Sequence, residues 1–179
     1  DKPHKADLFS FNAYMNNELK TEFNVKANRI INDNLATGLF VYGTYNGFKS
    51  FDHLGNNGKG DGFRDYPSQT QINVANRWNY EVHDGLCSQT LINYTHEDRL
   101  GGQMAFTKDM EGSDSIYGLG GTVDRVHFFT KNGAPIGNTS SFGTQLSATY
   151  FKQDAFYGLS NYEGVETDVY ANALVNTMV

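Results

Sequence analysis

The sequence predicts an all-β protein built as an antiparallel meander, and three observations support this fold class. Short segments repeatedly alternate apolar and polar residues, whereas the i, i+3, i+4 spacing of an amphipathic helix is weak throughout. The composition combines 11 Tyr, 13 Phe and 19 Gly with only 3 Pro. Because aromatic residues favour strands and Gly favours turns, the composition and the alternation indicate the same fold class.

The alternation is clearest in residues 72–82, where Ile72, Val74 and Trp78 share one face and Asn73 and Arg77 share the other. Residues 142–150 and 169–176 repeat this pattern. Polar or glycine-rich connections bound each alternating segment. The predicted strands are, in chain order, Leu8 to Tyr14, Glu22 to Ile31, Gly38 to Tyr45, Gln71 to Val82, Ser88 to Glu97, Thr122 to Thr130, Phe142 to Lys152 and Glu166 to Thr177.

The connections between these segments alternate in length. NDNLAT, HDGL and NGAPIGNTSS are short, whereas residues 47–68, 98–121 and 153–164 are longer; only MNNELKT is short where a long connection is expected. Long outer loops and short periplasmic turns are typical of bacterial transmembrane β-barrels, whereas a soluble sandwich has no reason for this asymmetry. Several segments also approach the roughly 9–11 residues that a tilted transmembrane strand needs. The rhythm therefore favours a barrel wall.

Charge and cysteine content exclude several classes of protein. Lys plus Arg total 14 against 20 Asp plus Glu, with a pI near 5.2. Such a balance argues against nucleic-acid binding, which depends on clustered cations. The single cysteine, Cys87, cannot form an internal disulfide, and the sequence lacks zinc-site spacing. No run of 18 apolar residues is present, so a helical membrane span is not expected.

Four motifs occur together in one order. They are Asp61-Gly62-Phe63-Arg64-Asp65, then Asn76-Arg77-Trp78, then Glu97 to Gln103 (EDRLGGQ), and finally Gln153 to Gly158 (QDAFYG). In this order they resemble the barrel of TonB-dependent outer-membrane receptors, in the branch that imports siderophores, cobalamin and similar scarce nutrients. The resemblance covers the chain from about residue 8 to its end.

The resemblance implies that residues 1–179 are a portion of the barrel domain, about eight strands of a wall with roughly 22 strands. The plug domain and the remaining strands are expected to lie outside this chain. The implied function is TonB-energised import across the cell outer membrane, without enzymatic activity or a required cofactor. The implied partners are the TonB-ExbB-ExbD complex acting through the plug, outer-membrane lipid, a small nutrient and, as a further candidate, a surface lipoprotein lid.

Two other classes remain open. A self-contained eight-stranded outer-membrane barrel needs only the strands predicted here. A soluble β-sandwich that acts as a binding module shows the same alternation, because each of its sheets has one face in water.

Residues 94–109, YTHEDRLGGQMAFTKD, begin like the end of a strand and place His, Glu, Asp and Arg next to two glycines. Paired carboxylates beside an arginine suit acid-base catalysis, but no nucleophile or metal motif accompanies them. The favoured interpretation is a strand end at which Arg99 holds Glu97 or Asp98 and two glycines turn the chain. As the rim of an outer loop, this region supplies candidate ligand contacts: Glu97, Arg99, Gln103, Asp154, Tyr157 and Tyr162. Arg77, Asn79 and Glu81 are expected to face the lumen or the plug.

A weak calcium-loop pattern places Asn57, Asp61 and Asp65 around Gly62. Lys59 stands where an oxygen ligand is needed, so a turn closed by hydrogen bonds is the favoured alternative. Gly118 to Gly121 (GLGG) lacks the ending of a phosphate-binding loop and predicts a flexible loop.

Overall fold

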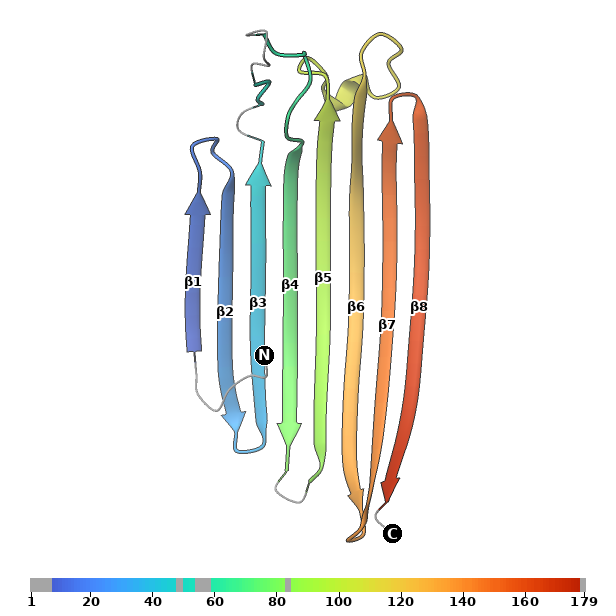
Figure 1. The fold of residues 1–179 in the computed structure, drawn as a ribbon. Helices are drawn as coiled ribbons and strands as arrows, with labels where there is room; N and C mark the ends of the chain where they lie inside the picture. Colours follow the sequence, from blue (N-terminus) through green and yellow to red (C-terminus); the bar gives the residue numbers. More distant parts are fainter. Residues whose placement is uncertain (1–7, 48–49, 54–58, 83–84, 178–179) are drawn as a thin grey trace.

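The computed structural model describes residues 8–47, 50–53, 59–82 and 85–177. They form one open sheet of eight antiparallel strands in sequence order (Figure 1). The elements are β1 (Leu8–Met15), β2 (Thr21–Asn32), β3 (Leu35–Asn46), β4 (Ser68–Glu81), β5 (Cys87–Gly102), a 3-10 turn η1 (Lys108–Met110), β6 (Gly118–Ile136), β7 (Ser140–Tyr157) and β8 (Ser160–Thr177). The predicted all-β meander is confirmed.

The later strands are longer than the alternation predicts. β5 continues past Glu97 to Gly102, and β6 begins at Gly118 rather than at residue 122. Residues 99–102 pair in register with residues 118–121, so the GLGG segment is strand and the flexible-loop prediction was wrong. Glycine has no side chain to alternate between faces, and therefore the pattern did not reveal this pairing.

The connections differ from the predicted rhythm at one point. Residues 153–164 do not form a long loop: Gln153 pairs with Gly164, and the chain turns at Gly158 (φ 59°) and Leu159. A left-handed backbone at that position suits glycine. Two long connections remain, between β3 and β4 and between β5 and β6, and both leave the same end of the sheet (Figure 1).

The register separates two faces across the whole sheet. We call one the apolar face; two of its rows are Val41, Val74, Tyr94, Val126, Tyr150 and Leu39, Asn76, Ile92, Phe128, Ala148, Val169. We call the other the polar face; its rows include Ala75, Asn93, His127, Thr149 and Asp168. On the polar face Asn73 Nδ2 donates to Thr95 Oγ1 at 2.6 Å, and His127 Nδ1 lies 2.9 Å from Thr149 Oγ1. The sheet is therefore amphipathic.

Very little apolar surface is buried within the described residues, where only Phe106, Ala155 and Phe156 are buried hydrophobic side chains. No second sheet packs on the first there, as a β-sandwich requires. β1 and β8 lie at opposite edges and do not pair with each other over the described residues (Figure 1). The structure described thus shows neither a sandwich nor a closed eight-stranded barrel.

No helix in residues 8–47, 50–53, 59–82 or 85–177 is long and apolar enough to cross a membrane.

Candidate functional site

The best-defined site lies at the end of the sheet that carries both long connections. There the segment that begins at Gly62 meets the segment that follows Gly102. Phe63 and Gln103 form an isolated antiparallel bridge. The Arg64 amide donates to the Gly102 carbonyl at 2.9 Å, and the Met104 amide donates to the Gly62 carbonyl at 2.8 Å. Two sequence motifs about 40 residues apart therefore form one structural unit, which we call the loop junction.

The Arg64 side chain strengthens the loop junction. Its Nη2 donates to the main-chain oxygen of Phe106 at 2.6 Å. Gln103 forms two hydrogen bonds with the main chain of Tyr117. Its side-chain Oε1 accepts from the Tyr117 N–H at 2.8 Å, and its main-chain N–H donates to the Tyr117 carbonyl at 2.9 Å. The rings of Phe63 and Tyr117 lie 6.4 Å apart. The Arg64 and Phe63 contacts hold the loop between β3 and β4 against the loop between β5 and β6, whereas the Gln103 bonds close the β5–β6 loop on itself.

Two aromatic rings cover glycines beside the loop junction. A Cβ on Gly118 would lie 2.2 Å from the Phe106 ring, and a Cβ on Gly120 would lie 2.8 Å from the Phe156 ring. Phe106 is 1% exposed, and its ring centroid lies 5.9 Å from that of Phe156. Each ring occupies the space that a side chain would fill at the glycine beneath it. Phe106 and Phe156 therefore form a small hydrophobic cluster over Gly118 and Gly120, and we call these four residues the seat.

The charged residues Glu97, Asp98 and Arg99 lie on β5. Arg99 Nε pairs with Glu97, as the sequence predicts, and Gln69 Nε2 donates to the same Glu97 oxygen at 3.4 Å. Asp98 points to the other face, where its Oδ2 accepts from Lys108 Nζ at 3.3 Å and from Thr122 Oγ1 at 3.1 Å. The two carboxylates thus have separate partners on opposite faces, which does not suit paired acid-base catalysis.

A cavity of about 310 Å³ lies next to these charges, and we call it the rim cavity. Lys108 and Glu111 of the β5–β6 connection contribute to its lining. Three of the predicted contact residues also line it: Arg99, Asp154 and Tyr162. Asp154 is held by Lys152, whose Nζ lies 2.9 Å from its Oδ2. The cavity offers both charge signs and an aromatic ring to a small polar molecule.

The other predicted contact residues lie outside the rim cavity. Glu97 is neutralised by Arg99, and Gln103 is engaged in the loop junction. Tyr157, 53% exposed, precedes the turn between β7 and β8. The register places Asp154 on the same face as Asp98, whereas Tyr162 shares the face of Arg99. The predicted set therefore includes residues on both faces of the sheet.

Arg77, Asn79 and Glu81 alternate along β4 and share the polar face. Arg77 pairs with Gly38 and Leu91, and Asn79 pairs with Ala36 and Gln89. Their common orientation agrees with the alternation in the sequence.

The loop that weakly resembles a calcium site is closed by its own hydrogen bonds. Asp52 accepts the amides of Asp61 and Gly62 at 3.0 and 2.8 Å. Asp61 accepts the Phe63 amide at 2.9 Å, and Asp65 accepts the His53 amide at 2.6 Å. Asn57 lies outside the described residues, and within those residues no group of three or more His, Cys, Asp or Glu could hold a metal ion.

Hydrogen bonds from the His53 amide and ring lower the pKa of the Asp65 carboxyl below its ordinary value. Asp65 also donates its own amide to the Phe51 carbonyl at 3.0 Å. The negative charge of Asp65 therefore helps to close the loop.

Sequence reasoning missed the seat formed by Phe106, Phe156 and the two glycines. Gly118 and Gly120 are two residues apart and so share a face of β6. Two glycines on one face leave that part of the strand without side chains, which indicates that a ring from elsewhere in the chain covers it. Nothing in the sequence pairs Arg64 with Phe106.

Comparison of the sequence with protein-family models and curated proteins, and of the structure with solved structures, finds no match.

Proposed function

We propose that this sheet is part of the wall of a transmembrane β-barrel in the outer membrane, and that the barrel is a TonB-dependent receptor importing a scarce nutrient. One observation carries the membrane part of the proposal: in-register pairing keeps an apolar face separate from a polar face across eight strands. On the apolar face large side chains remain exposed, among them Ile92 (51%), Val169 (68%) and Val175 (65%). Such a surface needs lipid or another apolar cover.

The extent of the apolar face fits a bilayer. On β7 it runs from Phe142 to Tyr150, a segment within the roughly 9–11 residues that span a membrane. Beyond the Tyr94 and Tyr150 row the same face becomes charged. His96 Nδ1 lies 2.8 Å from Asp124 Oδ1, which also accepts from the Tyr94 hydroxyl at 2.7 Å. Aromatic residues followed by charges are typical of the boundary between lipid and water.

The two edges of the sheet indicate further strands. Within a bilayer the unpaired main-chain groups of an edge strand have no water to bind, so β1 and β8 need partners. We propose that other strands of the same barrel supply them, to a total of about 22 in a transporter of this class.

The receptor part of the proposal rests on the sequence resemblance and gains support from the loop junction. Two of the four resembling motifs, GFRD and EDRLGGQ, contact each other at the loop junction, and Arg99 and Leu100 of the second motif also line the rim cavity. We propose that Arg99 and Tyr162, whose side chains share the polar face, contact the nutrient, a siderophore or cobalamin-like molecule. Glu97, Gln103 and Tyr157 would lie at the border of this contact, and Asp154 lies on the opposite face of the rim. TonB, ExbB and ExbD would act through a plug, and a surface lipoprotein is a candidate lid.

Neighbouring residues on β7 test the membrane orientation. In a Cys87→Ser background, nitroxide labels at Leu146→Cys and Gln145→Cys report opposite faces at the same depth. We expect the label at 146 to collide mainly with dissolved oxygen and the label at 145 mainly with a polar nickel complex. Equal exposure of both labels to the nickel complex in lipid vesicles would contradict a membrane wall.

Transport is tested separately in cells that express the intact protein. Accumulation of radioiron-loaded siderophores and of radiolabelled cobalamin is compared with and without a proton ionophore. Energy-dependent accumulation of one of these is expected. Passive accumulation, or none in a correctly inserted barrel, would argue against an energised receptor while leaving the membrane orientation intact.

A further inference from the structure

A group of uncharged polar side chains interrupts the apolar face where β5, β6 and β7 run side by side. They share the face of Ile92, Phe128 and Ala148, because each stands an even number of residues away along the same strand. All of them are half-buried. We call this group the polar island, and its members are Ser88, Thr90, Thr130, Asn132 and Thr144.

Asn132 is the centre of the polar island. Its Oδ1 accepts from the Ser88 hydroxyl at 2.6 Å, and its Nδ2 donates to Thr130 Oγ1 at 3.4 Å and to Thr144 Oγ1 at 3.3 Å. The Thr90 and Thr130 hydroxyls lie 3.2 Å apart and share one hydrogen bond. Over the described residues, the hydroxyl hydrogens of Thr144 and of either Thr90 or Thr130 have no acceptor. The polar island therefore has both donors and acceptors left for a neighbour.

The depth of the polar island excludes lipid as the source of its hydrogen bonds, a step that rests on the membrane placement proposed above. On β7, Thr144 lies between Phe142 and Leu146 on the lipid-facing side. It is six positions from Tyr150 at the aromatic boundary, which is about 20 Å along the strand and about 15 Å of depth at the usual tilt. Because the apolar band of a barrel is about 25 Å tall, the polar island lies within the hydrocarbon and needs a protein partner.

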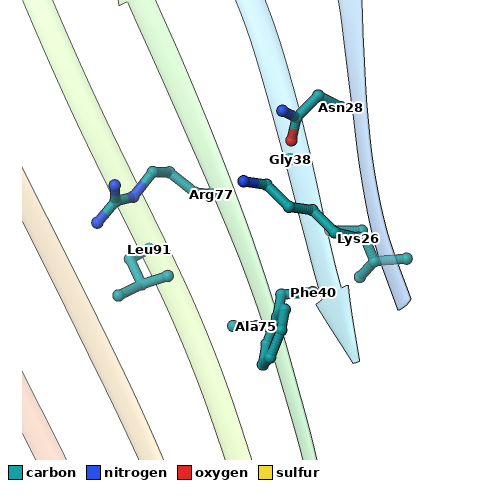
Figure 2. A pocket seen from close by; sticks show the side chains of 8 residues that line it. Lys26, Asn28, Gly38, Phe40, Ala75, Arg77 and Leu91 are labelled. Carbon is teal, nitrogen blue, oxygen red and sulfur yellow. The ribbon is translucent and has the colours of Figure 1, made fainter. Parts of the chain in front are cut away.

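No charged side chain belongs to the polar island or flanks it in register over the described residues. The flanking positions in its own two rows and in the row above are Trp78, Tyr80, Leu146, Ala173, Ile92 and Phe128. The polar face is different, because Figure 2 shows charged side chains such as Lys26 and Arg77 extending from β2 and β4 there. Two copies of the polar island would meet without like-charge repulsion.

The surroundings of the polar island also allow a second sheet to come close. Toward β8 the side chains are small, with Ala148, Ala171 and Ala173 on the same face. Toward β4 the exposed rings of Trp78 and Tyr80 stand beside it. Small side chains let polar groups of two membrane proteins reach hydrogen-bond distance, and aromatic rings at the border exclude solvent from such a contact.

We propose that the polar island is the contact between two copies of this chain in the membrane, related by a two-fold axis along the membrane normal. Thr130 and Asn132 lie near that axis. Hydroxyl hydrogens of one copy donate to the Ser88 and threonine oxygens of the other. A two-fold contact brings the same surface together from both copies, and a surface that carries donors and acceptors complements itself. The contact is separate from the rim cavity and does not involve the nutrient.

Disulfide cross-linking of the intact protein in its membrane tests the proposed axis. In a Cys87→Ser background, Thr130→Cys places a thiol at the axis, whereas Ala27→Cys places one on the same face of β2, four strands away. At about 4.8 Å per strand, Ala27 lies about 19 Å from the axis, and its two copies are too far apart for a disulfide, which needs Cα atoms within about 7 Å. A copper phenanthroline complex takes two electrons from a pair of thiols, and two protons are released as the disulfide forms. We expect several-fold more linked dimer from Thr130→Cys.

Energy transfer between fluorophores on the native Cys87 tests the contact without a new cysteine. Cys87 is exposed, and it lies on the polar face next to Ser88. Donor-labelled and acceptor-labelled proteins in lipid vesicles should show transfer that persists on dilution with lipid. Thr130→Val combined with Asn132→Leu removes hydrogen-bonding groups while keeping similar volumes, and should reduce transfer several-fold. Thr149→Val, which removes a hydroxyl from the polar face of β7, is the matched control.

Preferential cross-linking at position 130, with energy transfer lost in the double variant and kept in Thr149→Val, would support the proposal. Equal cross-linking at positions 27 and 130, no transfer in the parent protein, or a link from position 130 to a different protein would each overturn it. The heat-dependent gel mobility of each variant shows whether the barrel has formed, and transfer in the parent protein decides if Thr130→Cys does not insert. The nitroxide labels on β7 report the membrane face independently, so a monomeric result would leave the proposed membrane placement intact.

Discussion

The Nη2 atom of Arg64 lies 2.6 Å from the main-chain oxygen of Phe106, and this contact joins two loops that are distant in sequence. Phe106 in turn covers Gly118. A residue of the β3–β4 connection thereby holds the β5–β6 connection against the end of β6. The β3–β4 and β5–β6 loops of the proposed receptor are consequently held together at this end of the sheet.

Arg64→Met should loosen both loops while keeping a side chain of similar length. The change removes a charged hydrogen bond worth roughly 1.5–3 kcal/mol. Amide hydrogen exchange in peptides from residues 59–66 and 103–117 should accelerate, with the strands unchanged. Lys131→Met, at the other end of the sheet, should leave those peptides protected. Unchanged exchange in Arg64→Met would show that the loops are held by the main-chain bonds alone.

Gly118→Ala should displace the Phe106 ring, because the new Cβ would stand 2.2 Å from it. Overpacking of this kind costs about 1–3 kcal/mol. Trypsin cleavage after Lys108 measures the release of the loop and should become faster. Gly143→Ala, which has room for its Cβ, is the control.

A double variant tests the same contact more strictly. In Gly118→Ala with Phe106→Ala the clash is gone, so the combined effect should be smaller than the sum of the two single effects. Additive effects on cleavage would mean that ring and glycine act independently.

Asp65→Asn should open the loop between β3 and β4 at neutral pH. The His53 hydrogen bonds lower the pKa of Asp65, so the carboxylate stabilises the closed loop above its ordinary pKa of about 3.9. That contribution is lost as the pH falls through the lowered pKa of the folded protein. Exchange of residues 59–66 should therefore differ between the parent and the variant at pH 7 and converge in stronger acid. An equal difference at every pH would rule out the Asp65 charge as the cause.

Alanine at Arg99 or Tyr162 should weaken binding of the nutrient that we propose this protein to take up. Interface positions that matter commonly cost more than about 1 kcal/mol on truncation, which is roughly a fivefold loss of affinity. Tyr157→Ala, outside the rim cavity, should have a smaller effect, and Lys131→Ala none. Equilibrium binding of the labelled nutrient to the intact receptor measures all four. Unaltered affinity in Arg99→Ala and Tyr162→Ala would remove the rim cavity from the binding site.

Alternation predicted the strands and their faces well where side chains are large and of clearly different polarity. Ile72, Val74 and Trp78 share a face in the structure as they do in the pattern. The pattern failed at residues 118–121, where glycine carries no side chain to place on either face. It also failed at residues 153–164, because the turn at Gly158 and Leu159 leaves the surrounding polar residues paired in register.

The site was less predictable than the strands. The Arg99 and Glu97 pair follows from their spacing along one strand and was predicted. The contact between Arg64 and Phe106 depends on how two loops meet, and a row such as Asn28, Gly38 and Arg77 depends on which strands lie side by side. Such relationships across strands are set by the register and are not visible in either segment alone.

The register has a further consequence for how this chain tolerates sequence change. In a single-layer sheet almost every strand side chain lies on one of two faces. A substitution therefore changes the environment at one position and leaves the other side chains on their faces. Deletion of one residue within β7 would shift every following residue of that strand by one position, and the side chains of the apolar and polar faces would change places. Insertions and deletions of two residues preserve the parity of the strand. The strands of this sheet should therefore accept insertions or deletions of two residues far more readily than those of one residue.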